Sequence, residues 1–264
     1  MGAVIDTEEF RADWQQWHAA REAELAQPFG WLTPVALHWL GQHPEGYPGL
    51  PGRWWFDDSG TWFEPAGAPV LLDGAELTAK TRVGEAAGAA VGRLTTGDRW
   101  LELIGRGKGN RGVRVRDPQA PARTVFAGVP AYEPDPRWRI VATFSPLPQV
   151  QEVPVGSASE RVQHVRQLIG HATFIHEGSE HTLAVSGGHA VSIAFRDATS
   201  GAETFGLLRQ LAVEPDGDTV VLDFNRATNP PCSFSDFGTC PLPPPGNVLP
   251  FAVTAGEKLP LRPA

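Results

Sequence analysis

Short β-type segments separated by turn residues recur along most of this sequence, and this pattern restricts its fold more than any other feature. The chain has 264 residues, of which 29 are glycine and 25 are proline. Ten short stretches have strand-type composition: 53–56, 61–63, 70–72, 100–104, 112–116, 138–144, 182–185, 190–195, 205–213 and 219–224. Turn signals every ~8–12 residues, without long helical patterns between strands, favour antiparallel sheets. We therefore predict a mainly β fold, an antiparallel sandwich or barrel-like sheets, rather than a parallel doubly wound sheet.

Two places in this pattern give more detailed expectations. Valine alternates with arginine over 112–116, which predicts that the valines point inward and that Arg114 and Arg116 point outward. The dipeptide Asp216-Gly217 predicts a hairpin turn that joins the last two strands.

Helical signals gather at the start of the chain, where we expect one or two helices. The first begins at Asp6, a residue suited to capping, and ends before Gln27-Pro28. One stripe of this helix is apolar and consists of Phe10, Trp14, Trp17 and Leu25. A second, shorter helix is expected over 34–40, because proline is favoured at the first helical position.

Tryptophan and cysteine divide the chain into two parts. All nine tryptophans lie between Trp14 and Trp138, and both cysteines lie in the last 33 residues. A stretch rich in proline and small residues, 145–157, separates the two parts. We therefore expect one compact unit with two lobes: 1–145, with the helices and a tryptophan-rich β lobe, and 157–264, a β lobe with a proline-rich loop.

Charge and hydropathy exclude several classes of partner. The formal net charge of −8 argues against nucleic acids and anionic membranes, since binding either one requires a basic face. No stretch approaches the ~20 apolar residues of a membrane span, and residues 1–9 do not have the pattern of a secretory leader. Two cysteines do not make a disulfide framework. We expect a soluble cytoplasmic protein whose partner is a small molecule; the oligomeric state is left open.

The C-terminal segment 220–258 carries the strongest functional signal. It leaves a strand at Asp223-Phe224 and then contains seven prolines between Pro230 and Pro250. Proline lowers the entropy cost of ordering a loop, and rigid loops commonly carry binding groups. The polar candidates in this segment are Asn225, Arg226, Asn229, Cys232, Asp236, Cys240 and Asn247.

The same segment resembles a bacterial and archaeal family, domain of unknown function 1684 (DUF1684). The matching residues are Asp223–Arg226, Asn229–Cys232, Cys240–Pro244, Asn247 and Ala255–Lys258, with Asp197–Gly201, Glu203–Phe205, Arg209, Gly30–Leu32 and Trp39-Leu40 upstream. Thr228 stands where the family pattern has an aromatic residue. The resemblance implies a soluble, mostly β protein and brings no reaction with it.

Other clusters leave alternatives open. Cys232 and Cys240 are too far apart for a zinc-ribbon pair, so they are buried structural thiols, a reactive or redox pair, or metal ligands with a histidine. Five of the eight histidines lie over 164–189 without a metal-binding spacing, so we predict no metal site. The basic stretch 105–112 is a hairpin turn or a weak phosphate contact.

These observations support an enzyme acting on a small polar or anionic substrate at the C-terminal motif. The candidate catalytic residues are Cys232, Arg226 and Asp197, and the candidate substrate-binding residues are Asn225, Asn229, Arg209 and Asn247. Glu257 and Lys258 are acid/base candidates or an ion pair. One alternative is a non-catalytic small-molecule-binding or accessory protein in which the motif is structural. A second alternative is a flavin- or haem-binding split-barrel-like protein; the cofactor is otherwise unknown.

Overall fold

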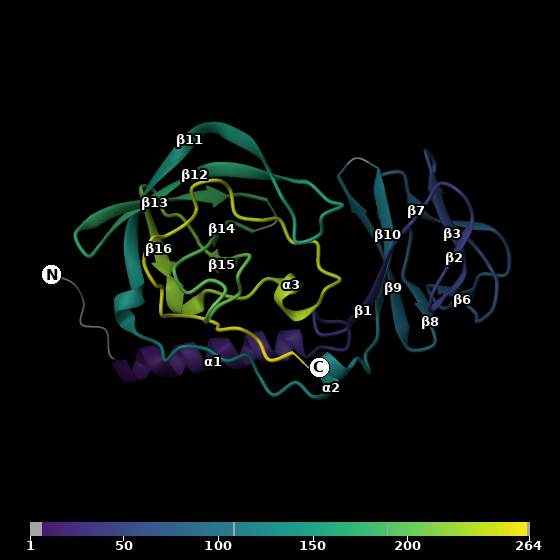
Figure 1. The fold of residues 1–264 in the computed structure, drawn as a ribbon, viewed down its shortest axis with the longest axis horizontal. Helices are drawn as coiled ribbons and strands as arrows, with labels where there is room; N and C mark the ends of the chain where they lie inside the picture. The colour runs from purple at the N-terminus through teal and green to yellow at the C-terminus, as the bar shows by residue number, and fades with distance from the viewer. Residues whose placement is uncertain (1–6, 108, 189, 263–264) are drawn as a thin grey trace.

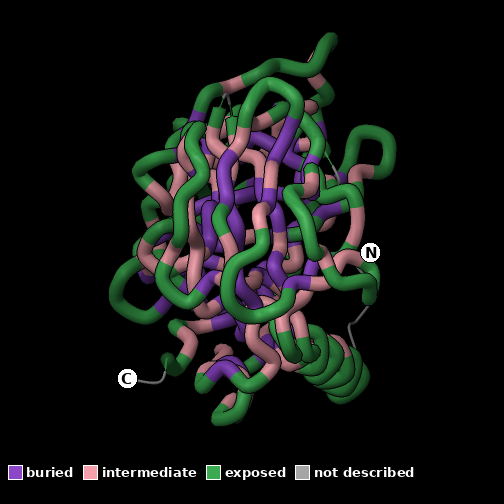
Figure 2. Tube along the Cα trace, turned by 90° about the vertical axis from the view of Figure 1, so that its right-hand side faces the viewer, coloured by how far each residue is buried: buried purple, intermediate pink, exposed green. Residues whose placement is uncertain are grey.

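The chain forms two β lobes and one long helix in a computed structural model that describes residues 7–107, 109–188 and 190–262 (Figure 1). Strands dominate, and they form three antiparallel sheets. Figure 2 shows that buried residues gather within the sheets, while exposed residues form the connecting loops. The predicted mainly β fold is confirmed.

The first lobe is a sandwich of two sheets. One sheet has the strand order β1-β10-β9-β8-β5-β6, and the other has the order β2-β3-β4-β7. Side chains from both sheets, among them Trp54, Phe63, Leu101 and Val113, form one apolar core between them. The strands are β1 (Pro34–Trp39), β2 (Glu45–Tyr47), β3 (Leu50–Asp57), β4 (Gly60–Glu64), β5 (Leu71–Leu72), β6 (Ala75–Glu76), β7 (Thr81–Glu85), β8 (Leu94–Thr96), β9 (Arg99–Arg106) and β10 (Asn110–Arg116).

The second lobe is one curved sheet with the strand order β15-β14-β13-β12-β11-β16. The segment that follows the edge strand β16 returns to the opposite edge, where Thr228 and Gln210 of β15 exchange backbone hydrogen bonds of 2.9 and 2.8 Å. The concave side holds an apolar core around Phe195 and Phe224. The strands are β11 (Arg139–Val155), β12 (His164–His176), β13 (Ser179–Ser186), β14 (Ser192–Phe195), β15 (Arg209–Ala212) and β16 (Thr219–Asp223).

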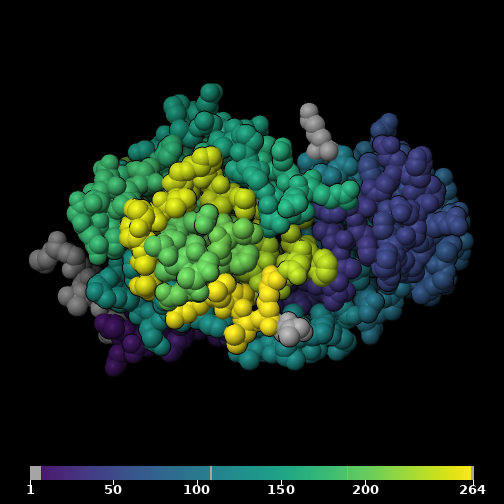
Figure 3. Space-filling model, in the orientation of Figure 1, coloured from purple at the N-terminus to yellow at the C-terminus, as the bar shows by residue number. Residues whose placement is uncertain are grey.

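The long helix α1 (Thr7–Leu25) packs against the second lobe, although the first lobe follows it in the chain (Figure 1). The Trp14 indole Nε1 donates a 2.7 Å hydrogen bond to the backbone oxygen of Asn225. Shorter helices are α2 (Pro121–Thr124), η1 (Pro136–Trp138), η2 (Phe224–Arg226) and α3 (Pro231–Phe234). The first helix is thus present as expected, while its predicted cap, Asp6, lies outside the described residues. Figure 3 shows the last part of the chain spread over the face of the second lobe.

The helix expected over 34–40 is wrong: this stretch is strand β1. Residues 34–39 pair antiparallel with β10, with Leu37 opposite Arg114 and Trp39 opposite Gly112. A six-residue apolar stretch gives a weak helical signal, and here the hydrogen bonds of a neighbouring strand decide its conformation.

The prediction that Arg114 and Arg116 point outward is also wrong, because both side chains are buried rather than exposed to solvent. The valines of β10 do face the sandwich core, but the opposite face of this strand packs against the second lobe. There Glu102 accepts hydrogen bonds from Arg114 Nη1 at 3.1 Å and from Arg116 Nε at 2.7 Å. Arg114 Nε also donates to the backbone oxygen of Phe237, at 3.0 Å. The strand therefore lies between two lobes rather than at a surface.

The stretch 145–157 does not connect two sheets, because most of it lies within β11. The pairing of β11 with β12 shifts register between Pro146 and Gln151. Prolines lack a backbone donor and are therefore tolerated at such an irregularity. The change from the sandwich to the curved sheet comes earlier, between β10 and β11.

The Asp216-Gly217 turn is present, but the predicted hairpin is wrong. Asp216 and Thr219 exchange backbone hydrogen bonds of 2.8 and 3.0 Å, which close the turn. The strands on either side, β15 and β16, lie at opposite edges of the sheet and pair with β14 and β11 instead. Curvature of the sheet brings its edges together, so a tight turn can link strands that are not paired.

Replacing Glu102 with glutamine tests how much the buried cluster of Glu102, Arg114 and Arg116 stabilises the fold. Two buried guanidinium groups then lose their only carboxylate among the described residues, and we expect the free energy of unfolding to fall by about 3–5 kcal/mol. Asp117→Asn is the matched control, since its ion pair with Arg99 is solvent-exposed and worth about 0–1 kcal/mol. Denaturant titration measures both variants, and equal losses would contradict the importance given to Glu102.

Candidate functional site

The asparagines predicted to bind substrate are buried and bonded to the backbone. Asn247 Oδ1 accepts the Ala184 N–H at 2.8 Å, and its Nδ2 donates to the backbone oxygens of Ala184 and Ala194, each at 2.9 Å. It thereby joins β13 to β14, whose ladder is short. Asn225 exchanges hydrogen bonds of 2.8 and 3.0 Å with the backbone of Asp135. These side chains hold irregular segments in place.

Asn229 and Glu257 fix the start and the end of the motif to each other. Glu257 Oε2 accepts the Asn229 N–H at 2.5 Å, and Asn229 Nδ2 donates to the Lys258 backbone oxygen at 2.7 Å. Glu257 also accepts a 3.2 Å hydrogen bond from Arg21 of α1. Burial raises the pKa of the Glu257 carboxyl, while the nearby Arg21 charge opposes this shift.

Asp197 and Arg209 form a buried ion pair with an Nη1–Oδ2 distance of 3.0 Å. Asp197 Oδ1 also accepts the N–H and the hydroxyl of Thr199, at 2.7 and 2.6 Å. The Arg209 guanidinium donates to the backbone oxygens of Val253 and Ala255. The pair therefore anchors the C-terminal segment, with both side chains at most 1% exposed.

Arg226 lies apart from these groups, in a groove of about 1100 Å³ between α1 and the edges of the second lobe. Its guanidinium pairs with Asp13 of α1 and lies 3.7 Å from Asp223. Its carbon Cζ is 5.6 Å from the Trp17 ring centroid. Carboxylates line the groove as well, so its cations are already paired.

The two cysteines are free thiols in contact, and one of them borders a cavity. The Cys232 backbone N–H donates to Cys240 Sγ at 3.2 Å. Both residues are buried, with 7% and 8% exposed. Hydrogen bonding from Cys232 lowers the pKa of the Cys240 thiol, whereas the hydrogen bond to Cys240 and burial raise the pKa of Cys232.

The cavity beside Cys240 lies where the two lobes and the proline-rich loop meet, and we call it the junction cavity. Its volume is about 480 Å³. The first lobe and the segment before it contribute Arg106 and Trp31, and β12 contributes His164 and Arg166. The remaining lining residues are Leu208, Gln210, Pro230, Pro231, Thr239, Cys240 and Pro241.

The described lining of the junction cavity is basic. Arg106 Nε donates to the Thr239 hydroxyl at 3.0 Å, and its Nη2 makes no hydrogen bond to the described residues. Arg166 donates to the backbone oxygens of Leu242 and Pro241 at 2.7 and 2.8 Å, which leaves its Nη1 without a bond to them. His164 Nε2 lies 2.6 Å from the Thr239 backbone oxygen, and burial lowers the pKa of its imidazole.

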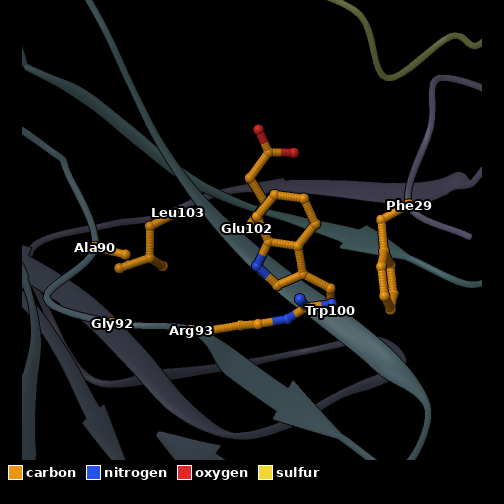
Figure 4. A pocket seen from close by; sticks show the side chains of 7 residues that line it. All are labelled: Phe29, Ala90, Gly92, Arg93, Trp100, Glu102 and Leu103. Carbon is orange, nitrogen blue, oxygen red and sulfur yellow. The ribbon is translucent and has the colours of Figure 1, made fainter. Parts of the chain in front are cut away.

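A second cavity, of about 340 Å³, is lined by residues of the first lobe and by Phe29, which precedes it in the chain (Figure 4). Figure 4 shows Arg93 reaching toward Trp100, with Phe29 beside them. The Arg93 Cζ is 4.5 Å from the Phe29 ring centroid and 5.6 Å from that of Trp100. Glu102 lines this cavity, and its carboxylate is already bonded to Arg114 and Arg116. Its charged side chains are thus engaged in contacts within the protein.

Within the described residues, no group of three histidine, cysteine, aspartate or glutamate side chains is placed to hold a metal ion. None of the helices that these residues form is long and apolar enough to cross a membrane.

The chain belongs to the DUF1684 family of proteins of unknown function, whose family model matches residues 124–258. It is similar to an uncharacterized protein from gene locus rrnAC0354 of Haloarcula marismortui, known from a solution NMR structure. The two sequences are 32% identical, the match covers 52% of this chain and 79% of that one, and the TM-score is 0.44. A search of curated proteins found no match.

The loop singled out from the sequence contributes Pro230, Pro231, Thr239, Cys240 and Pro241 to the junction cavity. Within the described structure, none of the seven predicted site residues lines the junction cavity. Arg106 belongs to the basic stretch 105–112, for which a phosphate contact was one alternative. His164 and Arg166 share one face of β12, and their spacing of two residues in a strand was the signal that could have found them.

Asp197→Asn and Arg226→Gln test which of the predicted catalytic residues stabilise the fold. Asp197 belongs to a buried ion pair and Arg226 to a half-exposed one. We expect Asp197→Asn to lower the free energy of unfolding by about 3–5 kcal/mol, because Arg209 remains buried without its counter-charge. Arg226→Gln removes a half-exposed pair and should cost about 0–1 kcal/mol. Chemical denaturation compares the two; full stability of Asp197→Asn would refute the scaffold role.

Proposed function

We propose that this protein binds a small anionic molecule in the junction cavity. The observation that carries the proposal is the charge of the lining: Arg106, Arg166 and His164 are present, and the described lining residues include no carboxylate. The chain as a whole has a net charge of −8. Cations gathered in a cavity of an acidic protein attract anions to that place rather than to its general surface.

Size and free donors support the same proposal. A volume of about 480 Å³ lies within the roughly 300–1,000 Å³ typical of small-molecule sites. Arg106 Nη2 and Arg166 Nη1 each keep N–H groups free of the described residues, while their other nitrogens are held by protein oxygens. Guanidinium groups that are fixed in this way match the geometry of carboxylate or phosphate. Trp31 and the prolines supply an apolar wall.

The proposal keeps the substrate class inferred from the sequence and moves its recognition to other arginines. Both Nη groups of the buried Arg209 are bonded to Asp197 and backbone oxygens, and Arg226 is paired with Asp13. Anion binding is common to an enzyme and to a non-catalytic binding protein. Two free thiols agree with a reducing compartment such as the cytoplasm.

Substituting the two cavity arginines tests the site directly. We expect Arg106→Gln and Arg166→Gln each to weaken binding of inorganic phosphate or citrate by about 10- to 100-fold, because a charge-assisted hydrogen bond is worth about 1.5–3 kcal/mol. Isothermal titration calorimetry measures the affinities, and thermal unfolding shows that each variant is folded. Arg82→Gln, on an exposed part of β7, is the control and should bind like the wild type. Unchanged affinity in both cavity variants would contradict the proposal.

The affinity of the cavity should also depend on pH through His164. Burial lowers the pKa of its imidazole below about 6.5, so the ring is neutral near neutral pH. A bound anion favours the protonated ring, and binding therefore strengthens as the pH falls toward this pKa. Calorimetry with sulfate, whose charge is constant from about pH 5.5 to about pH 7.5, measures the trend. His164→Gln should flatten it, and an unchanged slope in that variant would assign the trend to another group.

A further inference from the structure

Cys240 and Cys232 form an unequal thiol pair at the wall of the junction cavity. Cys240 lines the cavity, whereas Cys232 lies behind it in α3. The Cys240 Sγ accepts the Cys232 backbone N–H at 3.2 Å. One sulfur therefore faces the cavity and accepts a backbone N–H, while the other lies in the residue that donates it.

The surroundings of Cys240 are cationic. Hydrogen bonding from Cys232 and the charges of Arg114 and Arg166 lower the pKa of the Cys240 thiol, outweigh burial, which raises it, and so favour the thiolate. Arg114 is fully buried, and its Nη2 has no hydrogen-bond partner among the described residues. A buried guanidinium with a free N–H stabilises an anion close to it. These features are those of reactive cysteines, which are thiolates in electropositive sites.

The loop between the two cysteines keeps them in contact. Gly238 packs directly against Cys232, and a β-carbon at position 238 would lie 2.8 Å from the Cys232 Cα. Any larger residue there would push the two segments of the loop apart. The close approach brings the resolving thiol within reach without a large movement of the chain.

We propose that Cys240 is the reactive thiolate of the junction cavity and that it is oxidised by a hydroperoxide, with Cys232 as the resolving thiol. The proposal goes beyond anion binding and does not depend on which anion the cavity takes.

The reaction has two steps. The Cys240 thiolate attacks one peroxide oxygen, so that an S–O bond forms and the O–O bond breaks, and the leaving oxygen takes a proton to become water or an alcohol. Cys232, having given up its proton, then attacks the sulfur of the sulfenic acid, an S–S bond forms, and hydroxide leaves and is protonated to water. Sulfur is oxidised from two thiols to one disulfide, and the peroxide is reduced. A dithiol reductant restores both thiols by exchange.

The test uses the full-length protein with one equivalent of hydrogen peroxide and reads the products by mass spectrometry. In the wild type we expect an intramolecular Cys232–Cys240 disulfide, seen as the loss of two hydrogens and of both alkylation sites. In Cys232→Ser we expect a sulfenic acid at Cys240 that dimedone captures. In Cys240→Ser we expect thiol loss to slow by about tenfold or more, because the remaining thiol is largely protonated at neutral pH.

A second measurement addresses the thiolate without an oxidant. The rate of Cys240 alkylation by iodoacetamide in Cys232→Ser should have its pH midpoint below the usual cysteine value of about 8.5. Arg166→Gln should move that midpoint upward, whereas Arg82→Gln should leave it unchanged; circular dichroism shows that each variant is folded. Dimedone capture at Cys232 as fast as at Cys240, or no disulfide in the wild type, would overturn the proposal.

Discussion

The structure depends on one buried charged cluster of the first lobe, formed by Arg114, Arg116 and Glu102 on the face that meets the second lobe. One carboxylate serves two buried guanidinium groups, which also lie 5.0 and 4.5 Å from the ring centroid of Trp31. Arg114 reaches further, to the backbone of Phe237 in the proline-rich loop. Because buried charges must keep their partners, Glu102 holds the Arg114 guanidinium in one position on the first lobe, and the hydrogen bond to Phe237 ties the proline-rich loop to that position. The walls of the junction cavity are thereby held at one spacing.

Several polar residues of the family motif supply the hydrogen bonds to backbone groups that neighbouring strands supply in a sheet. Between β16 and the end of the described chain, regular structure is limited to two short helical turns, so backbone groups need side-chain partners. Asn225, Asn229 and Asn247 each bond to the main chain of a distant segment. Buried polar groups are costly unless they are hydrogen-bonded, so the bonds that these side chains make favour one arrangement of the chain, although Asn229 Oδ1 has no partner among the described residues. The scaffold formed by the motif places Thr239, Cys240 and Pro241 at the cavity.

The sequence predicted the features that depend on local pattern and missed those that depend on the other lobe. Period-two stretches and the apolar stripe of α1 identified most strands and the helix. The six residues of β1 carried too little periodicity, and their conformation depends on β10. The burial of Arg114 could not be read from its strand, since the group that covers it, Phe237, is 123 residues away. The cavity likewise combines Trp31, Arg106, His164 and Cys240, which no local window contains.

Arginine side chains satisfy backbone oxygens of the proline-rich segment. Proline offers a carbonyl and no N–H, so a chain segment rich in proline has more acceptors than donors. Arginine supplies five N–H groups in a rigid fork, and its side chains here bond repeatedly to pairs of main-chain oxygens. Arg166 holds Pro241 and Leu242 in this way, and Arg262 holds Cys232 and Ser233. A fork fixed by two carbonyls still has N–H groups directed elsewhere. An arginine that orders the proline-rich loop, such as Arg166, therefore leaves a charged group with free N–H donors at the edge of the loop. In this fold the junction cavity lies at that edge.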